Sequence, residues 1–423
     1  MVNRLHHALA LGLTLTGLFG GCTLLPDASQ AESIALGQAT LTPADRAELA
    51  AVFADTLAAA QVELDVPGMA VALVYQDQIL LLEGWGYRDL ERELPVTLHT
   101  RFHIGSTHKS MTALLGAIAV DRGLLTWDDP VVTVAPEFEL SDSEATATVS
   151  LRHLLSMRSG ISDDVVDERM QARFSTPSLH DVAIANVSVL ELFSLVSQSE
   201  LLGAPGEVFD YSNVAIALAG YLTMFAAVDH WDDPRVEYET LLQDWILEPI
   251  GMADAVLQWS DAQASGDVAL PYVRAEDAVR EEDCSGRCTQ RNRWVVAERE
   301  DLDQDLLAPA GGLKASITDM AAYMITQVQG GIAPNGQRVV SRENLTATWQ
   351  PRWGNYAMGW EQFNHRGVQL LSHTGSFDNF FTVIGMLPEY ELGFVVLTNS
   401  DEAAAWQIPN VDFLVVDLLL ELE

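Results

Sequence analysis

Residues 102–120 read FHIGSTHKSMTALLGAIAV, a short polar start followed by a long apolar run. Apolar side chains recur along the run at the spacing of one helix face: Met111, Leu114, Leu115 and Ile118. This pattern predicts a buried helix from Ser106 to Val120 that stops at Gly123. We expect this helix to be central to the core.

Ser106 and Lys109 stand three residues apart at the start of this helix, so their side chains share one face. A serine hydroxyl is a weak nucleophile until a base takes its proton. A lysine held in a dry pocket can share that task, because desolvation disfavours the charged form. The same spacing also occurs in surface helix pairs. The chain has one other lysine, Lys314, which we interpret as a surface residue at a helix start.

Two further motifs carry candidate site residues. Tyr211-Ser212-Asn213 precedes an alanine-rich helix. A tyrosine beside a lysine ammonium can be a phenolate-like base, and an asparagine amide can hold a substrate carbonyl. His373-Thr374-Gly375-Ser376 ends a strand-like run, where glycine would let a substrate backbone approach closely. Taken alone, Tyr211 could be a core aromatic residue and His373 a strand residue with satisfied hydrogen bonds.

Strand patterns lie at both ends of the chain, and helical patterns fill its middle. The predicted strands are Met69–Tyr75, Gln78–Gly86, Tyr356–Gln362, Val368–Ser372, Phe380–Leu387 and Gly393–Thr398. Further predicted helices are Pro43–Val62 with Thr42 as its N-cap, Ser188–Ser199, Val214–Ala226, Val236–Leu247, Ile317–Gln329 and Val411–Leu422.

This order predicts an α/β fold of the α+β type. We expect an antiparallel sheet flanked by helices and formed from both chain ends, residues of about 41–105 and 307–423. A mostly helical subdomain, about 124–300, would be inserted between them. The active site is expected in the cleft between the two parts.

The three motifs occur once each, in the order Ser-x-x-Lys, Tyr-x-Asn and His-Thr-Gly. In this order they resemble those of the penicillin-recognising serine hydrolases, the group of class C β-lactamases, D-alanyl-D-alanine carboxypeptidases, D-aminopeptidases and related esterases. Further stretches match in register: Phe102–Ser106, Ser150–Leu155, Ser159–Ile161, Pro205–Gly206, Leu247–Met252 and Pro309–Leu313. The resemblance covers residues of about 45–420.

The resemblance implies a covalent mechanism. Ser106 would attack the acyl carbon, Lys109 and Tyr211 would carry the proton to the leaving group, and water would release the acyl-enzyme. The oxyanion hole would be formed by the backbone N–H groups of Ser106 and Ser376. The remaining residues expected to bind substrate are Asn213, His373, Thr374 and Gly375. The scheme requires no metal or other cofactor.

His373 departs from the family pattern. Class C β-lactamases and carboxypeptidases usually have lysine there, and that cation helps to hold a substrate carboxylate. We expect the charge of a histidine at the cleft edge to change between about pH 5 and 8. The sequence therefore favours hydrolysis of esters or small D-amino-acid peptides over efficient β-lactamase activity. The alternative is a penicillin-binding or sensor protein of the cell envelope that has the same fold but no turnover.

The charge balance excludes one class of partner. Sixty acidic and 23 basic residues give a net charge of −37, which would repel phosphate backbones and argues against nucleic-acid binding. We expect a small-molecule or peptide substrate and a monomeric protein.

Residues 1–21 are predicted to be an export signal, with Arg4 before an apolar stretch from Ala8 to Gly21. This stretch is shorter than the roughly 20 residues that a membrane span needs. The run from Phe19 to Cys22 resembles a bacterial lipobox, in which Cys22 would carry the lipid, and residues 22–40 would be a tether. The protein is therefore expected in the periplasm or anchored to a membrane, with ordinary secretion as the alternative.

Cys284 and Cys288 lie in the acidic stretch Ser260–Leu306, which is predicted to be a long loop. In an exported protein, these cysteines are expected to form a disulfide. A zinc site is the less favoured interpretation, because no histidine lies between His230 and His365 to complete it.

Overall fold

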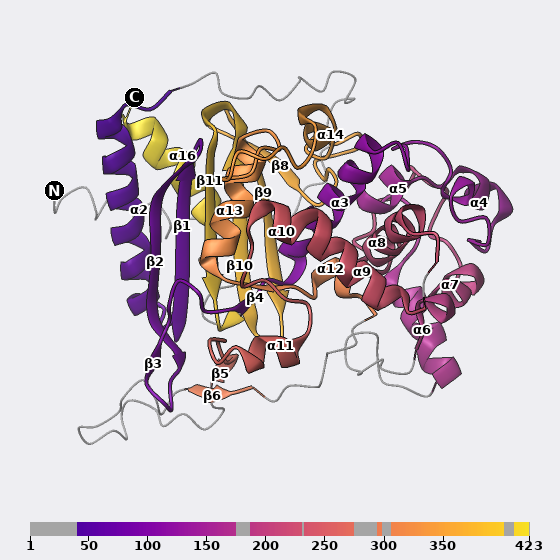
Figure 1. Ribbon diagram of the computed structural model, residues 1–423, viewed down its shortest axis with the longest axis horizontal. Helices are drawn as coiled ribbons and strands as arrows, with labels where there is room; N and C mark the ends of the chain where they lie inside the picture. The colour runs from indigo at the N-terminus through magenta and orange to yellow at the C-terminus, as the bar shows by residue number, and fades with distance from the viewer. Residues whose placement is uncertain are drawn as a thin grey trace, which may run out of the picture. The chain divides into compact units, whose positions relative to one another are not determined.

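The central layer of the protein is a seven-stranded antiparallel sheet with the order β3-β2-β1-β11-β10-β9-β8 (Figure 1). This is seen in a computed structural model that describes residues 40–174, 187–230, 232–274, 294–297, 306–401 and 410–422. The strands are β1 Gly68–Tyr75, β2 Gln78–Asp89, β3 Leu94–Pro95, β8 Glu361–His365, β9 Val368–Phe377, β10 Phe380–Leu387 and β11 Leu392–Thr398. The pairing of β1 with β11 joins the two ends of the chain, which confirms the predicted fold class.

Helices cover both faces of the sheet (Figure 1). α2 (Pro43–Glu63) and α16 (Val411–Leu422) share one core with one face of β1, and α13 (Ile317–Val328) belongs to the core on the other face. Every residue of β1 is buried, because its side chains alternate between these two cores. Thr42 caps α2 as predicted, with its hydroxyl accepting a hydrogen bond from the Asp45 backbone N–H at 3.3 Å.

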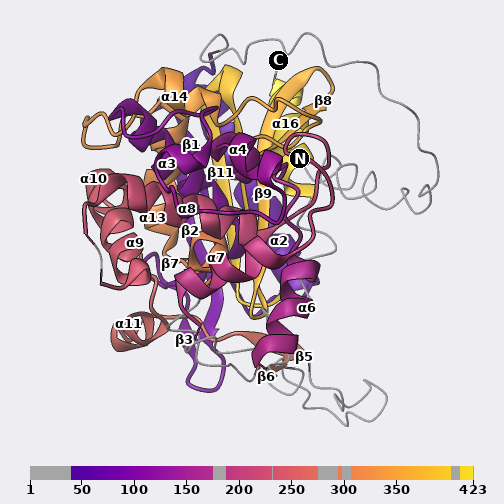
Figure 2. The same cartoon turned by 90° about the vertical axis from the view of Figure 1, so that its right-hand side faces the viewer.

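The helical part lies beside the sheet, and Figure 2 turns it toward the viewer. Its elements are α4 Ser143–Thr148, α5 Leu151–Leu155, α6 Asp163–Phe174, α7 Val189–Gln198, α8 Asn213–Ala227, α9 Pro234–Leu242, a π turn Gln243–Leu247, α10 Glu248–Ile250 and α11 Trp259–Ala264. α3 (Lys109–Asp121) packs against α8 inside the larger core. Within the described ranges, no helix combines the length and apolar character needed to cross a membrane.

The predicted helix from Ser106 to Val120 is correct except for its start. Residues Gly105–His108 form a 3₁₀ turn, and α3 begins only at Lys109. Ser106 therefore lies in a tight turn before the helix, and Lys109 begins the helix itself.

Three strand predictions need correction. The predicted strand Gln78–Gly86 is too short, because β2 continues to Asp89. The predicted strand Tyr356–Gln362 is mostly wrong, because β8 begins at Glu361. The residues before β8 form a loop that packs against the start of α3, since a Cβ on Gly359 would lie 2.7 Å from the backbone of Lys109. In contrast, the predicted strand Val368–Ser372 is too short, since β9 continues to Phe377 and contains the whole His-Thr-Gly-Ser motif.

The interpretation of Lys314 as a surface residue is wrong. Lys314 is only 1% exposed and lies in β7 (Lys314–Ala315), which pairs with β4 (Phe102–His103). Its Nζ donates to the carbonyl of Leu257 at 2.6 Å. The pairing of β7 with β4 places this lysine in the interior. The residues around Lys314 in the sequence do not distinguish a buried lysine from an exposed one.

Parts of the predicted loop Ser260–Leu306 are regular. α11 overlaps its first residues, and β5 (Tyr272–Arg274) pairs with β6 (Trp294–Val296). Cys284 and Cys288 lie outside the described residues, as do the predicted export signal, Cys22 and nearly all of the predicted tether.

Candidate active site

Lys109 is the polar centre of the candidate site. Its side chain is buried, and its Nζ donates to Ser106 Oγ at 2.8 Å, to Asn213 Oδ1 at 2.7 Å and to the carbonyl of Ala310 at 2.8 Å. A buried ammonium requires such acceptors, because the protein must replace the water that it has lost. The fold thus brings together residues from the Ser-x-x-Lys and Tyr-x-Asn motifs.

Tyr211 lies over the same lysine, with its ring centre 5.0 Å from Lys109 Nζ. Burial of the hydroxyl raises the pKa of Tyr211 to about 12, although a hydrogen bond with Ser106 acts in the opposite direction. The residue as a whole remains 41% exposed, so part of Tyr211 is open to solvent. The phenol is therefore protonated at neutral pH in this arrangement.

Two glycines allow β9 to approach the turn that carries Ser106. A Cβ on Gly375 would lie 2.2 Å from the Ile104 carbonyl oxygen and 2.9 Å from the Ser106 nitrogen. A Cβ on Gly105 would lie 2.9 Å from the Ser376 nitrogen, and Gly105 also has a positive φ of 53°. Because neither glycine has a side chain, β9 packs directly against the backbone of the 3₁₀ turn. The backbone nitrogens of Ser106 and Ser376 both lie at this contact.

His373 is buried beside Tyr356 rather than exposed at a cleft edge. It is 3% exposed, and its Nδ1 lies 2.6 Å from the Thr374 carbonyl oxygen, which can only accept. Nδ1 therefore carries the proton, and Nε2 accepts from the Tyr356 hydroxyl at 3.0 Å. Burial, followed by the nearby charge of Lys109, lowers the pKa of His373 to about 4. The expected change of charge between pH 5 and 8 is therefore wrong for this histidine.

A pH profile tests this assignment. Between pH 5 and 8, the ratio of kcat/KM for a carboxylate-bearing substrate to that for a neutral ester should show the same pH dependence in wild type and in His373→Gln. The reason is that His373 stays neutral until the pH approaches 4. The unfolded chain protonates this group near pH 6.5, so acidification from about 6.5 to 4 should destabilise the fold. An inflection of the ratio that is lost in His373→Gln would contradict the neutral assignment.

Asp163 was missed by the sequence analysis. Its carboxylate accepts hydrogen bonds from Ser212 Oγ at 2.6 Å, from Asn213 N at 2.8 Å and from Val214 N at 3.0 Å. These groups begin α8 and belong to or adjoin the Tyr-x-Asn motif. Asp163 has no local signature, because its partners lie about fifty residues further along the chain.

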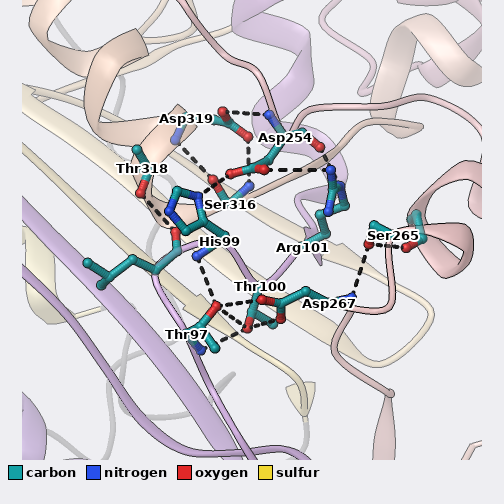
Figure 3. Close-up of polar contacts among 12 residues, drawn as sticks. Thr97, His99, Thr100, Arg101, Asp254, Ser265, Asp267, Ser316, Thr318 and Asp319 are labelled. Carbon is teal, nitrogen blue, oxygen red and sulfur yellow. Dashed lines mark hydrogen bonds and ion pairs between the residues drawn. The ribbon is translucent and has the colours of Figure 1, made fainter.

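A polar cluster holds the segment that leads to the nucleophile (Figure 3). Asp267 accepts from the Thr100 hydroxyl at 2.6 Å, and Asp254 pairs with His99 at 2.8 Å. Asp319 of α13 accepts from the Asp254 backbone N–H at 3.2 Å, and burial raises the pKa of Asp319 to about 6. These contacts hold residues 99 and 100 immediately before β4. The 3₁₀ turn that carries Ser106 follows β4.

Carboxylates lie close to the site. The Ser376 hydroxyl donates to Asp401 Oδ2 at 3.3 Å. Glu361 begins β8, and its negative charge adds to the effect of burial in raising the pKa of both Tyr211 and Tyr356. Negative charge therefore lies close to Ser376, Tyr211 and Tyr356.

A cavity of about 300 Å³ is lined by residues of β4, α9 and β7, among them His103, Tyr238 and Lys314. Ser106 and Lys109 do not line it. Among the residues that the structure describes, no group of three or more His, Cys, Asp or Glu side chains is arranged to hold a metal ion.

Comparison with known sequences identifies relatives. The sequence profile of the family described as Beta-lactamase matches residues 52–409. Protein flp of Staphylococcus aureus (strain MW2) is 25% identical over 335 residues, which are 79% of this chain and 60% of the relative. Unguisins hydrolase ungD of Aspergillus violaceofuscus is 24% identical over 360 residues, 79% of this chain and 58% of the relative. The chain thus spans about three-fifths of the length of these relatives.

Solved structures share the fold. The octameric penicillin-binding protein homologue from Pyrococcus abyssi has a TM-score of 0.68 at 24% identity, covering 88% of this chain and 77% of that one. The D-alanine carboxypeptidase AmpC from Burkholderia cenocepacia has a TM-score of 0.63 at 20% identity, covering 88% of this chain and 99% of that one. The family profile spans most of the sequence, from α2 to beyond β11, and the fold agrees with it. The chain therefore belongs to the beta-lactamase family of serine hydrolases.

Proposed function

We propose that the protein hydrolyses small esters or amides, including D-amino-acid peptides, through an acyl-enzyme on Ser106. The observation that carries this proposal is the 2.8 Å hydrogen bond between Lys109 Nζ and Ser106 Oγ in a buried site. A nucleophile within hydrogen-bond reach of a basic group, which is itself held by a third group, is the arrangement that nucleophilic catalysis requires. Here the third group is Asn213.

The proposed reaction has two steps, acylation of Ser106 and hydrolysis of the acyl-enzyme. In the acylating form Lys109 is a neutral amine, which donates to Asn213 and Ala310 and accepts the Ser106 proton. Ser106 Oγ forms a bond to the acyl carbon, and the proton passes from Lys109 by way of the Tyr211 hydroxyl to the leaving group as the bond to that group breaks. The backbone N–H groups of Ser106 and Ser376 stabilise the oxyanion of the tetrahedral intermediate. Water then attacks the acyl-Ser106 ester, giving the free acid and restoring the serine hydroxyl.

The charges at the site favour substrates without a carboxylate. His373 is neutral and engaged with Tyr356, and Asp401 lies beside Ser376. A substrate carboxylate at this end of β9 would lie near Asp401 and would lack the additional cation that a lysine in place of His373 supplies in the family it resembles. Neutral esters and amides are therefore proposed to be better substrates than β-lactams.

Labelling the nucleophile tests the proposed function. Purified protein is incubated separately with a fluorophosphonate, a fluorescent penicillin, p-nitrophenyl esters and D-amino-acid amides, and any adduct is located by mass spectrometry. A transient adduct on Ser106 with release of product is expected for the esters and amides. A lasting Ser106 adduct from an ester or amide without release of product would indicate a penicillin-binding or sensor protein, and neither adduct nor product with any probe would exclude both functions.

We also propose that Cys22 anchors the exported protein to a membrane through lipid. The proposal rests on the basic, apolar and Gly-Gly-Cys order of residues 1–22. The wild-type protein should partition into membranes and detergent, while Cys22→Ser should be released or remain unprocessed. The intact mass of the mature protein is the measurement, and an unlipidated chain that begins elsewhere would refute the anchor.

A further inference from the structure

Asp163 begins α6 and reaches the start of α8. Its Oδ1 accepts from Ser212 Oγ at 2.6 Å and from Val214 N at 3.0 Å, and its Oδ2 accepts from Asn213 N at 2.8 Å. Negative charge is favourable at this position, because the first N–H groups of a helix have no partners within the helix. The Ser212 hydroxyl in turn accepts from the Ala215 N–H at 3.0 Å, so the turn is held from both sides.

This turn carries two of the residues placed at the site. Asn213 is bound at its backbone by Asp163 and at its side chain by Lys109, whose Nζ donates to Oδ1 at 2.7 Å. Tyr211 directly precedes Ser212, which is in an extended conformation with φ −128° and ψ 113°. A rotation of this turn would therefore move the Asn213 side chain with respect to Lys109 and Ser106.

We propose that Asp163 is a positioning residue of the hydrolase: its carboxylate fixes the turn at Ser212 and so holds the Asn213 side chain against Lys109. This inference rests on the proposed acylation of Ser106. Asp163 acts through Asn213 and takes no part in the covalent chemistry. A helix cap that served stability alone would make the same three hydrogen bonds, so the test has to separate the acylation rate from stability.

Asp163→Asn is the first variant. An amide keeps one accepting oxygen, but its NH₂ group cannot accept the hydrogen bond from the Asn213 N–H. We expect the rate constant for acylation of Ser106 by a p-nitrophenyl ester to fall about tenfold to a hundredfold, because a displacement of about 1 Å can cost that much. The dissociation constant of the ester, taken from the concentration dependence of the acylation rate, should change less than about threefold, because the lost contact positions the reacting groups rather than the bound ester.

Asp142→Asn is the matched control. Asp142 is also a capping aspartate, and it accepts from the Ala145 N–H at 2.8 Å at the start of α4. This variant should lose some thermal stability, less than Asp163→Asn because one hydrogen bond is affected, and should keep the wild-type acylation rate. If Asp163→Asn fails to fold, Asp163→Glu replaces it, because a longer arm keeps the charge and shifts the contact.

A double-mutant cycle tests the route through Asn213. In an Asn213→Ala background, Asp163→Asn should lower the acylation rate less than about threefold, because the side chain that it positions is already gone. A wild-type acylation rate in folded Asp163→Asn, or a full rate loss in the Asn213→Ala background, would overturn the proposal. If wild type itself forms no Ser106 adduct with any probe, the proposed function fails as well, and the wild-type measurement alone identifies that outcome.

Discussion

Ser106→Ala should lower turnover of p-nitrophenyl esters by about 10⁴- to 10⁶-fold, the range observed when a covalent nucleophile is removed. The substitution deletes the oxygen that would form the acyl-enzyme and leaves the 3₁₀ turn without any added bulk. Lys109 Nζ loses one acceptor but keeps Asn213 Oδ1 and the Ala310 carbonyl. The melting temperature should therefore stay close to that of wild type. Initial rates and thermal unfolding on the same preparations measure the two effects.

Ser197→Ala is the control for this variant. Ser197 lies on α7, and its hydroxyl donates to the Ser194 carbonyl of the same helix at 3.0 Å, so its removal should leave turnover unchanged. Retention of wild-type ester hydrolysis by Ser106→Ala would eliminate the acyl-enzyme mechanism. Lys109→Ala is a less clean test, because it leaves three acceptors without their buried donor and should lower stability as well as rate.

The centre of the sheet could be predicted from the sequence because β1, β10 and β11 are long apolar runs. β10 and α16 have the predicted boundaries, and β1 and β11 differ from prediction by one residue at one end. Strands buried on both faces need apolar residues at every position, so they are distinct from the alternating pattern of a half-exposed strand. The pattern alone thus sufficed to place both chain ends in the same core.

The properties of individual site residues could not be predicted in the same way. The pKa of His373 depends on burial beside Tyr356, which belongs to a loop that the sequence had suggested to be a strand. Lys314 is buried because β7 pairs with β4, a segment distant in the sequence. Asp163 acts on a turn about fifty residues away. In each case the contact that sets the residue's property comes from a part of the chain distant in sequence, so no local sequence pattern predicts it.

Gly375→Ala should produce the second large loss of activity, about a hundredfold to a thousandfold in the acylation rate, as expected when an oxyanion donor is displaced. Gly375 lies in β9, and a Cβ there would be 2.2 Å from the Ile104 carbonyl oxygen and 2.9 Å from the Ser106 nitrogen. Both neighbours are backbone atoms and cannot rotate away. The strand must therefore move back from the 3₁₀ turn, and it takes the Ser376 N–H with it.

Gly336→Ala separates this effect from the general cost of replacing glycine. Gly336 has a φ of 83°, and a Cβ there would meet no atom within 4 Å, so alanine should cost only backbone strain of about 1 to 2 kcal/mol. That variant should melt earlier and keep the wild-type acylation rate. Stopped-flow acylation, measured where both variants are folded, makes the comparison. If Gly375→Ala acylates as fast as Gly336→Ala, the close approach of β9 does not form the oxyanion site, and stabilisation of the intermediate must come from groups other than the backbone of Ser106 and Ser376.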